Sequence, residues 1–347
     1  MTDCHDDPVL EIAKDVLLSL NGDEPELQAI KHHFHVLPAP LTTCSLKCSA
    51  FTYAISKLPS EVDVVVSVDA DAVVTPNWLE TLIAPLEDPK VGVSSGNRWF
   101  KIPANRKIGS AVRAVWNAAA VVQMYLYQIP WGGSLAIRRD VINDGNLMDQ
   151  WSNAFCEDTL LSQTVKELGL TFARPPEVVV VNEESITCQN AFRWIRRQLL
   201  TVRLHNRHWP LVFVHGLTVG LPLLVLELMV LGLFMGSGNA VTILLVSFLV
   251  FELTNLLLLI GIRRAHKHLL RRAGEEDVSE WSELFWYAIA LPITQLIHFG
   301  ATISAAVASQ VSWRQIQYRI GKSKVELVEY RPFITRSEQQ VEQQSID

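Results

Sequence analysis

This sequence of 347 residues contains no Cys-X-X-Cys pair and no recognisable basic nucleic-acid-binding module. Its five cysteines include no Cys-X-X-Cys pair, so neither a zinc site nor a dithiol redox site is indicated. An odd number of scattered thiols is typical of a reducing compartment such as the cytosol. The net charge of −6 argues against nucleic acid as a partner. No positively charged leader with a short apolar core opens the chain, so we expect no signal peptide.

Apolar residues, by contrast, are abundant and unevenly distributed. Hydrophobic residues make up 49% of the chain, and the mean hydropathy is +0.20. Three long apolar segments follow His208, at residues 211–235, 241–262 and 284–311. Each is as long as the ~20 residues that a helix needs to cross a hydrocarbon core. We therefore predict an integral membrane protein.

The part of the chain up to about Arg203 alternates strand-like and helix-like stretches. The Val-rich run 62–68 is typical of a fully buried parallel strand. Further strands are expected within residues 91–99, 129–142 and 171–184. Helices are expected at residues 8–20, 47–57, 75–86 (with Thr75 as N-cap and Pro76 in the first position), 106–127 and from about Asp158 onward. This alternation predicts a doubly wound α/β domain.

Two aspartates, Asp69 and Asp71, directly follow the run 62–68. Acidic residues at this point often do no more than begin a loop or cap the next helix. However, ligands of open α/β sheets bind at the carboxyl ends of the strands. Two carboxylates there are suited to Mg²⁺ or Mn²⁺, with a phosphate and water as the remaining ligands. The pattern is therefore compatible with either a loop start or a metal-assisted diphosphate site.

Three further motifs have both a structural and a functional interpretation. Gly132 and Gly133 would let the backbone approach a ligand closely, although tight turns use such pairs too. Glu157 and Asp158 open a predicted helix, where the helix dipole favours carboxylates in any case; a functional carboxylate would act there as a general base. Arg193 lies in a basic amphipathic stretch, which is either an interfacial anchor or a partner for a diphosphate.

The order of these motifs resembles that of the family-2-type inverting glycosyltransferases, written D, DXD, D, (Q/R)XXRW. The closest resemblance is to the ceramide glucosyltransferases of family 21. It runs from HDDPVLEIAKDVLL through Lys47, VDADAVV, GGSLAIRRDVI, EDTLLSQTVKELG and NAFRW to VSWRQIQYRIGKSKVELV, which is nearly the whole chain. It implies an α/β fold, with a GT-A (Rossmann-like) nucleotide-sugar domain followed by a C-terminal helical membrane domain.

The resemblance also implies a role for individual residues. Asp158 matches the catalytic base, and Asp71, with Asp69, matches the ligands of a divalent metal, Mn or Mg. The residues expected to bind the nucleotide sugar are Asp69, Asp71, Lys47, Gly132, Gly133, Arg193, Trp194 and Arg314. Asn190 stands where the family has Gln or Arg at the start of (Q/R)XXRW, and Gln189 lies one residue earlier.

The resemblance further implies a division of the chain. It places the GT-A catalytic domain at residues 1–190, an amphipathic interfacial helix at 191–209, membrane segments at 210–311 and a cytosolic tail with a Trp-Arg-X-X-X-Tyr-like motif at 312–347. Compared with the family, the N-terminal membrane helix and the first strands are missing, which should expose edge strands. Asp3, Asp6 and Asp7 lie near the position of the aspartate that helps to bind the base.

The implied reaction is the transfer of a hexose, glucose by the resemblance, from a UDP-sugar to the hydroxyl of a membrane lipid such as ceramide. The catalytic domain is expected on the cytosolic side of the membrane. Two alternatives remain. A processive polysaccharide synthase shares these motifs but typically has more than three spans. A membrane homologue without catalysis would fit the shortened N-terminal part.

The third apolar segment is interrupted by Pro292, Gln295 and His298. It lies between two basic stretches, RRAHKHLLRR and SWRQIQYRIGKSK, and both should remain cytosolic by the positive-inside rule. A single crossing would separate them. We therefore predict that residues 284–311 form a re-entrant or interfacial hairpin, or a pair of short broken helices, rather than one straight span.

Overall fold

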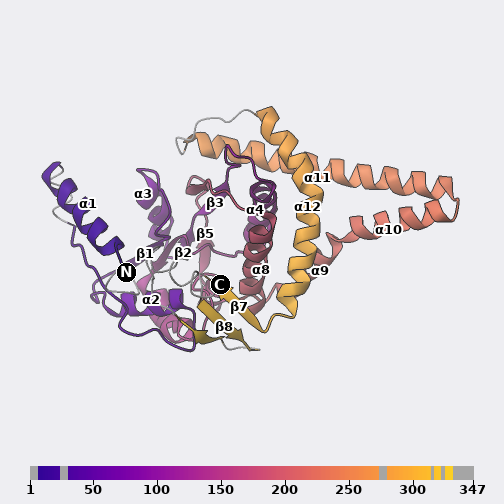
Figure 1. Cartoon of the computed structure of the whole chain (residues 1–347). Coiled ribbons are helices and arrows are strands. Elements are labelled where there is room, and N and C mark those ends of the chain that lie inside the picture. Colours follow the sequence, from indigo (N-terminus) through magenta and orange to yellow (C-terminus); the bar gives the residue numbers. More distant parts are fainter. Residues whose placement is uncertain (1–6, 24–29, 273–279, 314–315, 322–324, 331–347) are drawn as a thin grey trace, which may run out of the picture. The chain divides into compact units, whose positions relative to one another are not determined.

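The computed structural model describes residues 7–23, 30–272, 280–313, 316–321 and 325–330 (Figure 1). The chain divides into two compact units. The first unit combines residues 1–62, 147–157 and 309–347, and the second combines residues 63–146 and 158–308.

The second unit contains a four-stranded mixed sheet with the order β1 (Val64–Val68), β4 (Ser134–Arg138), β2 (Val91–Ser95) and β5 (Thr171–Ala173). Strand β4 is antiparallel to both β1 and β2, and only β2 and β5 are parallel. Our prediction of a fully buried parallel strand at 62–68 is therefore wrong, and the sheet is not a parallel, doubly wound one. Among the described strands β1 pairs on one side only, and Val65 is its one buried residue.

The run 91–99, predicted as one strand, forms two strands in different sheets. After β2 the chain continues as β3 (Asn97–Phe100), which pairs in parallel with β6 (Val179–Asn182). The change occurs at Gly96, whose N–H donates to the Ser134 carbonyl, whereas the N–H of Asn97 donates to the Val178 carbonyl. A Cβ at Gly96 would lie 2.5 Å from Val178 Cγ1, so only glycine allows this close approach.

Short helices connect the strands. Helix α3 (Trp78–Ile83) continues into the 3₁₀ helix η2 (Ala84–Glu87), and its Leu82 packs against the sheet. Thr75 is not the N-cap that we predicted, because α3 begins three residues later, after Asn77. The other short helices of this unit are α5 (Arg139–Asp144) and α7 (Leu161–Glu167).

Three long helices share one apolar core with β3 and β6. They are α4 (Ile108–Leu126), α8 (Cys188–His205) and α12 (Glu280–Ala306). Helix α4 confirms the prediction of a helix at 106–127. The prediction of a hairpin or broken helix at 284–311 is wrong, because α12 is one continuous α-helix that contains Pro292.

Helix α12 tolerates its proline because its packing compensates for the lost backbone hydrogen bond. A proline within a helix removes one donor and costs ~3 kcal/mol. In α12 the small side chains of Ala290, Ala301 and Ala305 are fully buried in the core formed with α4 and α8. Close packing along much of its length therefore keeps the helix continuous.

The first apolar segment forms two helices, not one span. Helix α9 (Trp209–Thr218) ends before Gly220, and α10 (Leu221–Phe234) starts with Pro222 in its first turn. Proline fits the first turn of a helix but not its interior, which explains the break. Gly216 and Gly220 lie against α12, where added Cβ atoms would come within 2.3 Å of Thr302 and 2.5 Å of Phe299.

Helix α11 (Gly238–Arg272) runs beside α10 as a hairpin (Figure 1). Two described helices are long and apolar enough to cross a membrane, judged by length and composition. In α11 only 6% of the most apolar window is buried, whereas the corresponding value for α12 is 44%. The apolar surface of α11 is therefore mostly exposed, while nearly half of the apolar window of α12 is covered by the unit to which it belongs.

The first unit brings together segments that are far apart in the sequence. The N–H of Leu327 in the tail donates to the carbonyl of Thr42, and the hydroxyl of Thr43 donates to the carbonyl of Ser152. The tail forms a three-stranded antiparallel sheet, which the sequence did not lead us to expect. The elements of this unit are α1 (Val9–Asp23), α2 (Leu46–Ser56), α6 (Leu147–Trp151), β7 (Gln310–Trp313), β8 (Ile316–Ile320) and β9 (Val325–Glu329).

Candidate active site

Asp69 and Asp71 lie in the turn that follows β1, in the second unit. The N–H of Asp69 donates to the Gly133 carbonyl over 3.2 Å, which continues the pairing of β1 with β4 beyond the strand ends. The N–H of Ala72 donates to the Asp69 carbonyl over 3.0 Å and closes the turn. Asp69 is partly buried, whereas Asp71 is exposed. The backbone therefore holds the first aspartate beside the Gly-Gly loop.

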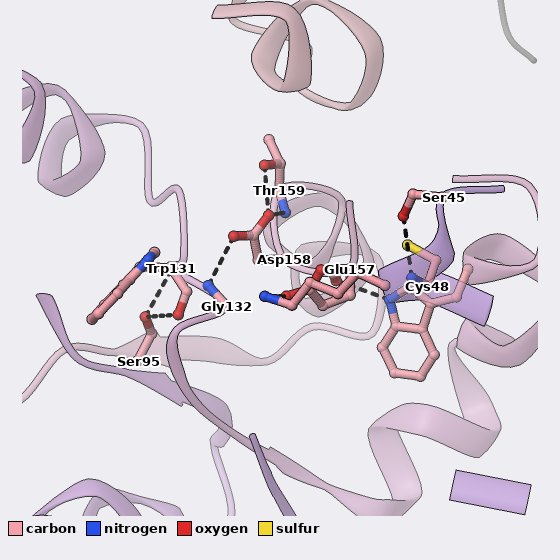
Figure 2. A network of polar contacts seen from close by, with 10 residues as sticks. Ser45, Cys48, Ser95, Trp131, Gly132, Glu157, Asp158 and Thr159 are labelled. Atoms are coloured by element: carbon pink, nitrogen blue, oxygen red, sulfur yellow. Dashed lines mark hydrogen bonds and ion pairs between the residues drawn. The ribbon is translucent and has the colours of Figure 1, made fainter. Parts of the chain in front are cut away.

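The loop with Gly132 and Gly133 is fixed at its start by Ser95 of β2. The Ser95 hydroxyl accepts a hydrogen bond from the N–H of Trp131 and donates one to the Trp131 carbonyl (Figure 2). A Cβ at Gly133 would lie 2.2 Å from the Trp131 ring and 2.6 Å from Asp69 Oδ2. Gly133 is thus required for the close approach of Asp69 to this loop.

Asp158 is hydrogen-bonded to the same loop, although it lies 26 residues beyond Gly132 in the sequence. Its Oδ2 accepts a hydrogen bond from the N–H of Gly132 over 2.8 Å, and its Oδ1 accepts bonds from the N–H and the hydroxyl of Thr159 (Figure 2). Asp158 precedes α7, which begins at Leu161 and not at Asp158 as we expected. The structure therefore brings Asp69, Gly132, Gly133 and Asp158 together, although they are far apart in the sequence.

Helix α8 carries Arg193 and Trp194, whose surroundings differ. The Trp194 ring packs edge-to-face against Phe100 and Trp116, with centroids 5.4 and 5.3 Å apart. Arg193 is exposed, and we find no hydrogen bond or ion pair for it within the described part of the chain. Neighbouring helix residues point about 100° apart, so these side chains lie on different faces of α8.

Arg98 on β3 is a residue that our sequence reasoning missed. Its guanidinium lies 4.6 Å above the centroid of the Trp194 ring and 5.8 Å from that of Trp131. Burial lowers its pKa to about 10, an effect that the carboxylates of Asp158 and Asp69 partly oppose. An arginine within a strand of otherwise buried residues could have pointed to Arg98 in the sequence, since buried charges need partners.

His205, at the last turn of α8, is a second such residue. Burial lowers its pKa to about 4, and the negative charge of Asp158 opposes this shift in part. Its imidazole is therefore neutral at physiological pH. Next to it, the amide of Asn206 donates to the Ser162 hydroxyl of α7 over 3.4 Å, which ties the end of α8 to the helix that follows Asp158.

Lys47 and Glu157 belong to the first unit. Lys47 Nζ and Glu157 Oε1 lie 2.7 Å apart, with the Lys47 side chain 33% exposed and that of Glu157 2% exposed. The Glu157 carbonyl also accepts a hydrogen bond from the Trp151 indole over 2.8 Å. Lys47 thus compensates the buried charge of the residue that directly precedes Asp158 in the chain.

The tail packs on the same segment of the first unit. The Phe155 ring contacts Trp313 and Tyr318, with centroids 5.9 and 5.5 Å apart, and the Tyr318 hydroxyl accepts a hydrogen bond from the N–H of Leu46. Burial raises the pKa of Tyr318 to about 12, so its hydroxyl stays protonated. Arg314, Asp3 and Asp6, to which the sequence pointed, lie outside the described residues.

The described residues contain no group of three or more His, Cys, Asp or Glu side chains arranged to hold a metal ion. Asp69, which lies beside the Gly-Gly loop, and Asp71, two residues later in the same turn, supply two carboxylates. They suit a cation that takes most of its ligands from phosphate and water, as Mg²⁺ often does.

Comparison with known families gives one match. The family model of glycosyl transferase family 21 matches residues 55–325. This range covers most of the chain, including the turn after β1, the Gly-Gly loop, Asp158, α8 and most of the tail sheet. No curated protein matched the sequence.

Proposed function

We propose that this chain, which belongs to glycosyl transferase family 21, is an inverting hexosyltransferase with a lipid acceptor. It transfers a hexose, glucose by the family resemblance, from a UDP-sugar to a hydroxyl of a membrane lipid such as ceramide. The observation that supports this most directly is the meeting of Asp69, the Gly132–Gly133 loop and Asp158 at one place. A carboxylate for the donor side and a carboxylate for the acceptor side are what a single displacement needs.

On the donor side, Asp69 and Asp71 are the residues that would hold Mg²⁺ or Mn²⁺. Asp71 is exposed and is the more direct ligand, while Asp69 is held beside the loop by its backbone. The cation, when bound, neutralises charge on the diphosphate leaving group. The Gly-Gly loop lets the backbone approach the sugar diphosphate closely.

On the acceptor side, Asp158 is the general base. The lipid hydroxyl oxygen attacks the anomeric carbon while its proton passes to the Asp158 carboxylate. A new C–O bond forms, the bond between the anomeric carbon and the diphosphate oxygen breaks, and UDP leaves with the electron pair. Attack from the face opposite the leaving group inverts the anomeric configuration, so an α-linked donor gives a β-linked glycolipid.

The acceptor class follows from the apolar helices. Helix α11 exposes many large apolar side chains, including Ile243, Leu249 and Leu257, which water does not solvate favourably. A bilayer covers the α10–α11 hairpin in our proposal and supplies the lipid. The basic residues of α8 then lie at the cytosolic surface, in keeping with the positive-inside rule, so the catalytic residues face the UDP-sugar.

The experiment is to incubate the purified full chain, in lipid vesicles, with labelled UDP-glucose and ceramide. We expect β-glucosylceramide, with product formation lost when divalent cations are chelated and restored by Mn²⁺ or Mg²⁺. A labelled polymer would indicate a polysaccharide synthase, and a chain that binds no UDP would contradict a transferase role. Transfer to another lipid hydroxyl would keep the reaction class and correct the acceptor.

A further inference from the structure

Arg98 connects two motifs of the candidate site. Its guanidinium lies over the ring of Trp194, the residue after Arg193, and near the ring of Trp131, the residue before Gly132. Cations over aromatic faces are held in a defined orientation. Arg98 therefore has a fixed position between the Gly-Gly loop and helix α8.

The hydrogen bonds of Arg98 leave its charge without an ion-pair partner. Its Nε donates to Asn117 Oδ1 over 3.2 Å, and its Nη2 donates to Gln198 Oε1 over 3.0 Å. Both acceptors are neutral amides. Within the described part of the chain no carboxylate lies within ion-pair distance of Arg98, and its Nη1 donates to no residue there.

Such an arrangement is unusual for a partly buried arginine, since charged groups away from water are normally paired. Asp69 and Asp158 attract the guanidinium only from a longer range, while Arg197 and Arg113 repel it. Arg113 has its own partner in Glu184. An anion that arrives between these groups would find a preorganised donor.

We infer that Arg98 is an anion-binding residue of the donor site, whose guanidinium contacts the diphosphate of the nucleotide sugar. The inference rests on the proposed function. A guanidinium suits this task because its planar fork matches phosphate oxygens. Asn117, Gln198 and Trp194 hold the plane in place, so little conformational entropy is lost when the diphosphate binds.

Arg174 offers a matched control in the same unit. Its Nη1 donates to Asn97 Oδ1 over 2.8 Å, its guanidinium lies 4.7 Å from the Tyr125 ring centroid, and burial lowers its pKa to about 10 as well. Its contact Asn97 precedes Arg98 on β3, and neighbouring strand residues point to opposite faces. Arg174 resembles Arg98 in setting but lies on the other face of this strand.

The test is a titration of the full chain with UDP in the presence of Mn²⁺, with uridine affinity measured by competition. We expect Arg98→Gln to weaken UDP binding at least about tenfold, as the loss of a charge-assisted phosphate contact does, while uridine affinity changes less than about twofold. Arg174→Gln should keep the wild-type ratio of the two affinities. Thermal unfolding of each variant checks that it is folded.

The outcomes separate the two proposals. A wild-type chain that binds no UDP contradicts the proposed function itself. UDP binding by the wild type with an unchanged UDP-to-uridine ratio in Arg98→Gln overturns this inference alone. If Arg98→Gln does not fold, Arg98→Lys decides: it keeps the charge but loses the fork, so a lowered ratio supports the inference and an unchanged ratio overturns it.

Discussion

The backbone N–H of Gly132 donates a hydrogen bond to Asp158 Oδ2 over 2.8 Å, so the Gly-Gly loop fixes the orientation of the carboxylate. A carboxylate has about four lone-pair sites. Thr159 occupies two of them at Oδ1 through its N–H and its hydroxyl, and Gly132 occupies one at Oδ2. The remaining site is on Oδ2, which is therefore the oxygen that accepts the proton in our proposal.

Asp158→Asn should abolish transfer without unfolding the protein. The amide oxygen still accepts hydrogen bonds but is a far weaker base, so we expect product formation to fall by about 10³-fold, within the usual range for general base catalysis. UDP binding should change little, and the unfolding temperature should fall only modestly, because Asn keeps one acceptor oxygen and the N–H of either Gly132 or Thr159 loses its partner. Asp149→Asn, at an exposed position of α6, is the control and should retain full activity. Transfer that survives Asp158→Asn at the wild-type rate would refute the assigned base.

Gly133→Ala should damage the donor site directly. The added Cβ would overlap the Trp131 ring at 2.2 Å and Asp69 Oδ2 at 2.6 Å, so at least one of the two must move. We expect UDP affinity in the presence of Mn²⁺ to fall about tenfold or more, because ligand-holding carboxylates tolerate little displacement. Gly261→Ala in α11 is the matched control, since no neighbouring atom would lie within 4 Å of its Cβ. Equal UDP affinities in the two variants would contradict this prediction.

Individual helices and strands could be predicted from the sequence, but the pairing of the strands within the sheets could not. Helix α4 was recognisable from its apolar spacing, which is a property of one segment. The pairing of β1 with β4 and the change of sheet at Gly96 depend on Ser134 and Val178, which lie far along the chain. A Val-rich run has the same pattern at the edge of a sheet as at its centre, so its place in the sheet was not encoded locally.

The Lys47–Glu157 pair leads to a prediction about stability. Removing one partner of a buried ion pair costs ~3–5 kcal/mol because the other charge is left uncompensated. Lys47 is 33% exposed, so water can partly replace it, and we expect Lys47→Met to cost less, about 1–3 kcal/mol. The double variant Lys47→Met/Glu157→Gln should recover part of that loss, because the buried side chain at position 157 is then no longer charged. Thermal unfolding of the wild type, Lys47→Met and the double variant measures these differences in stability. A double variant that is no more stable than Lys47→Met would contradict the argument.

Arg98 and the tail sheet show where sequence motifs fall short. The motifs pointed to Asp69, Gly132, Gly133 and Asp158, which the fold does bring together. Arg98 belongs to no such motif, and its significance follows only from the rings of Trp131 and Trp194 that enclose it. These contacts join β3, a loop and α8, so they depend on tertiary packing. Likewise, the contacts of Tyr318 with Phe155 and Leu46 join segments more than 100 residues apart.

The last prediction concerns pH and follows from His205. Its pKa is about 4 in the folded protein against an ordinary value of 6.5, so between these values the unfolded chain binds more protons. The free energy of unfolding therefore rises with pH in this window. The stability that the neutral imidazole contributes is lost as pH falls from 6.5 towards 4. The contribution amounts to about 2 kcal/mol between pH 7 and pH 5. His205→Asn should reduce the dependence by this amount, whereas Thr201→Val on the same helix, which removes no titratable group, should keep the wild-type slope. Urea unfolding in detergent, followed by tryptophan fluorescence at pH 7 and pH 5, measures both, and equal slopes for the wild type and His205→Asn would refute a neutral, buried imidazole.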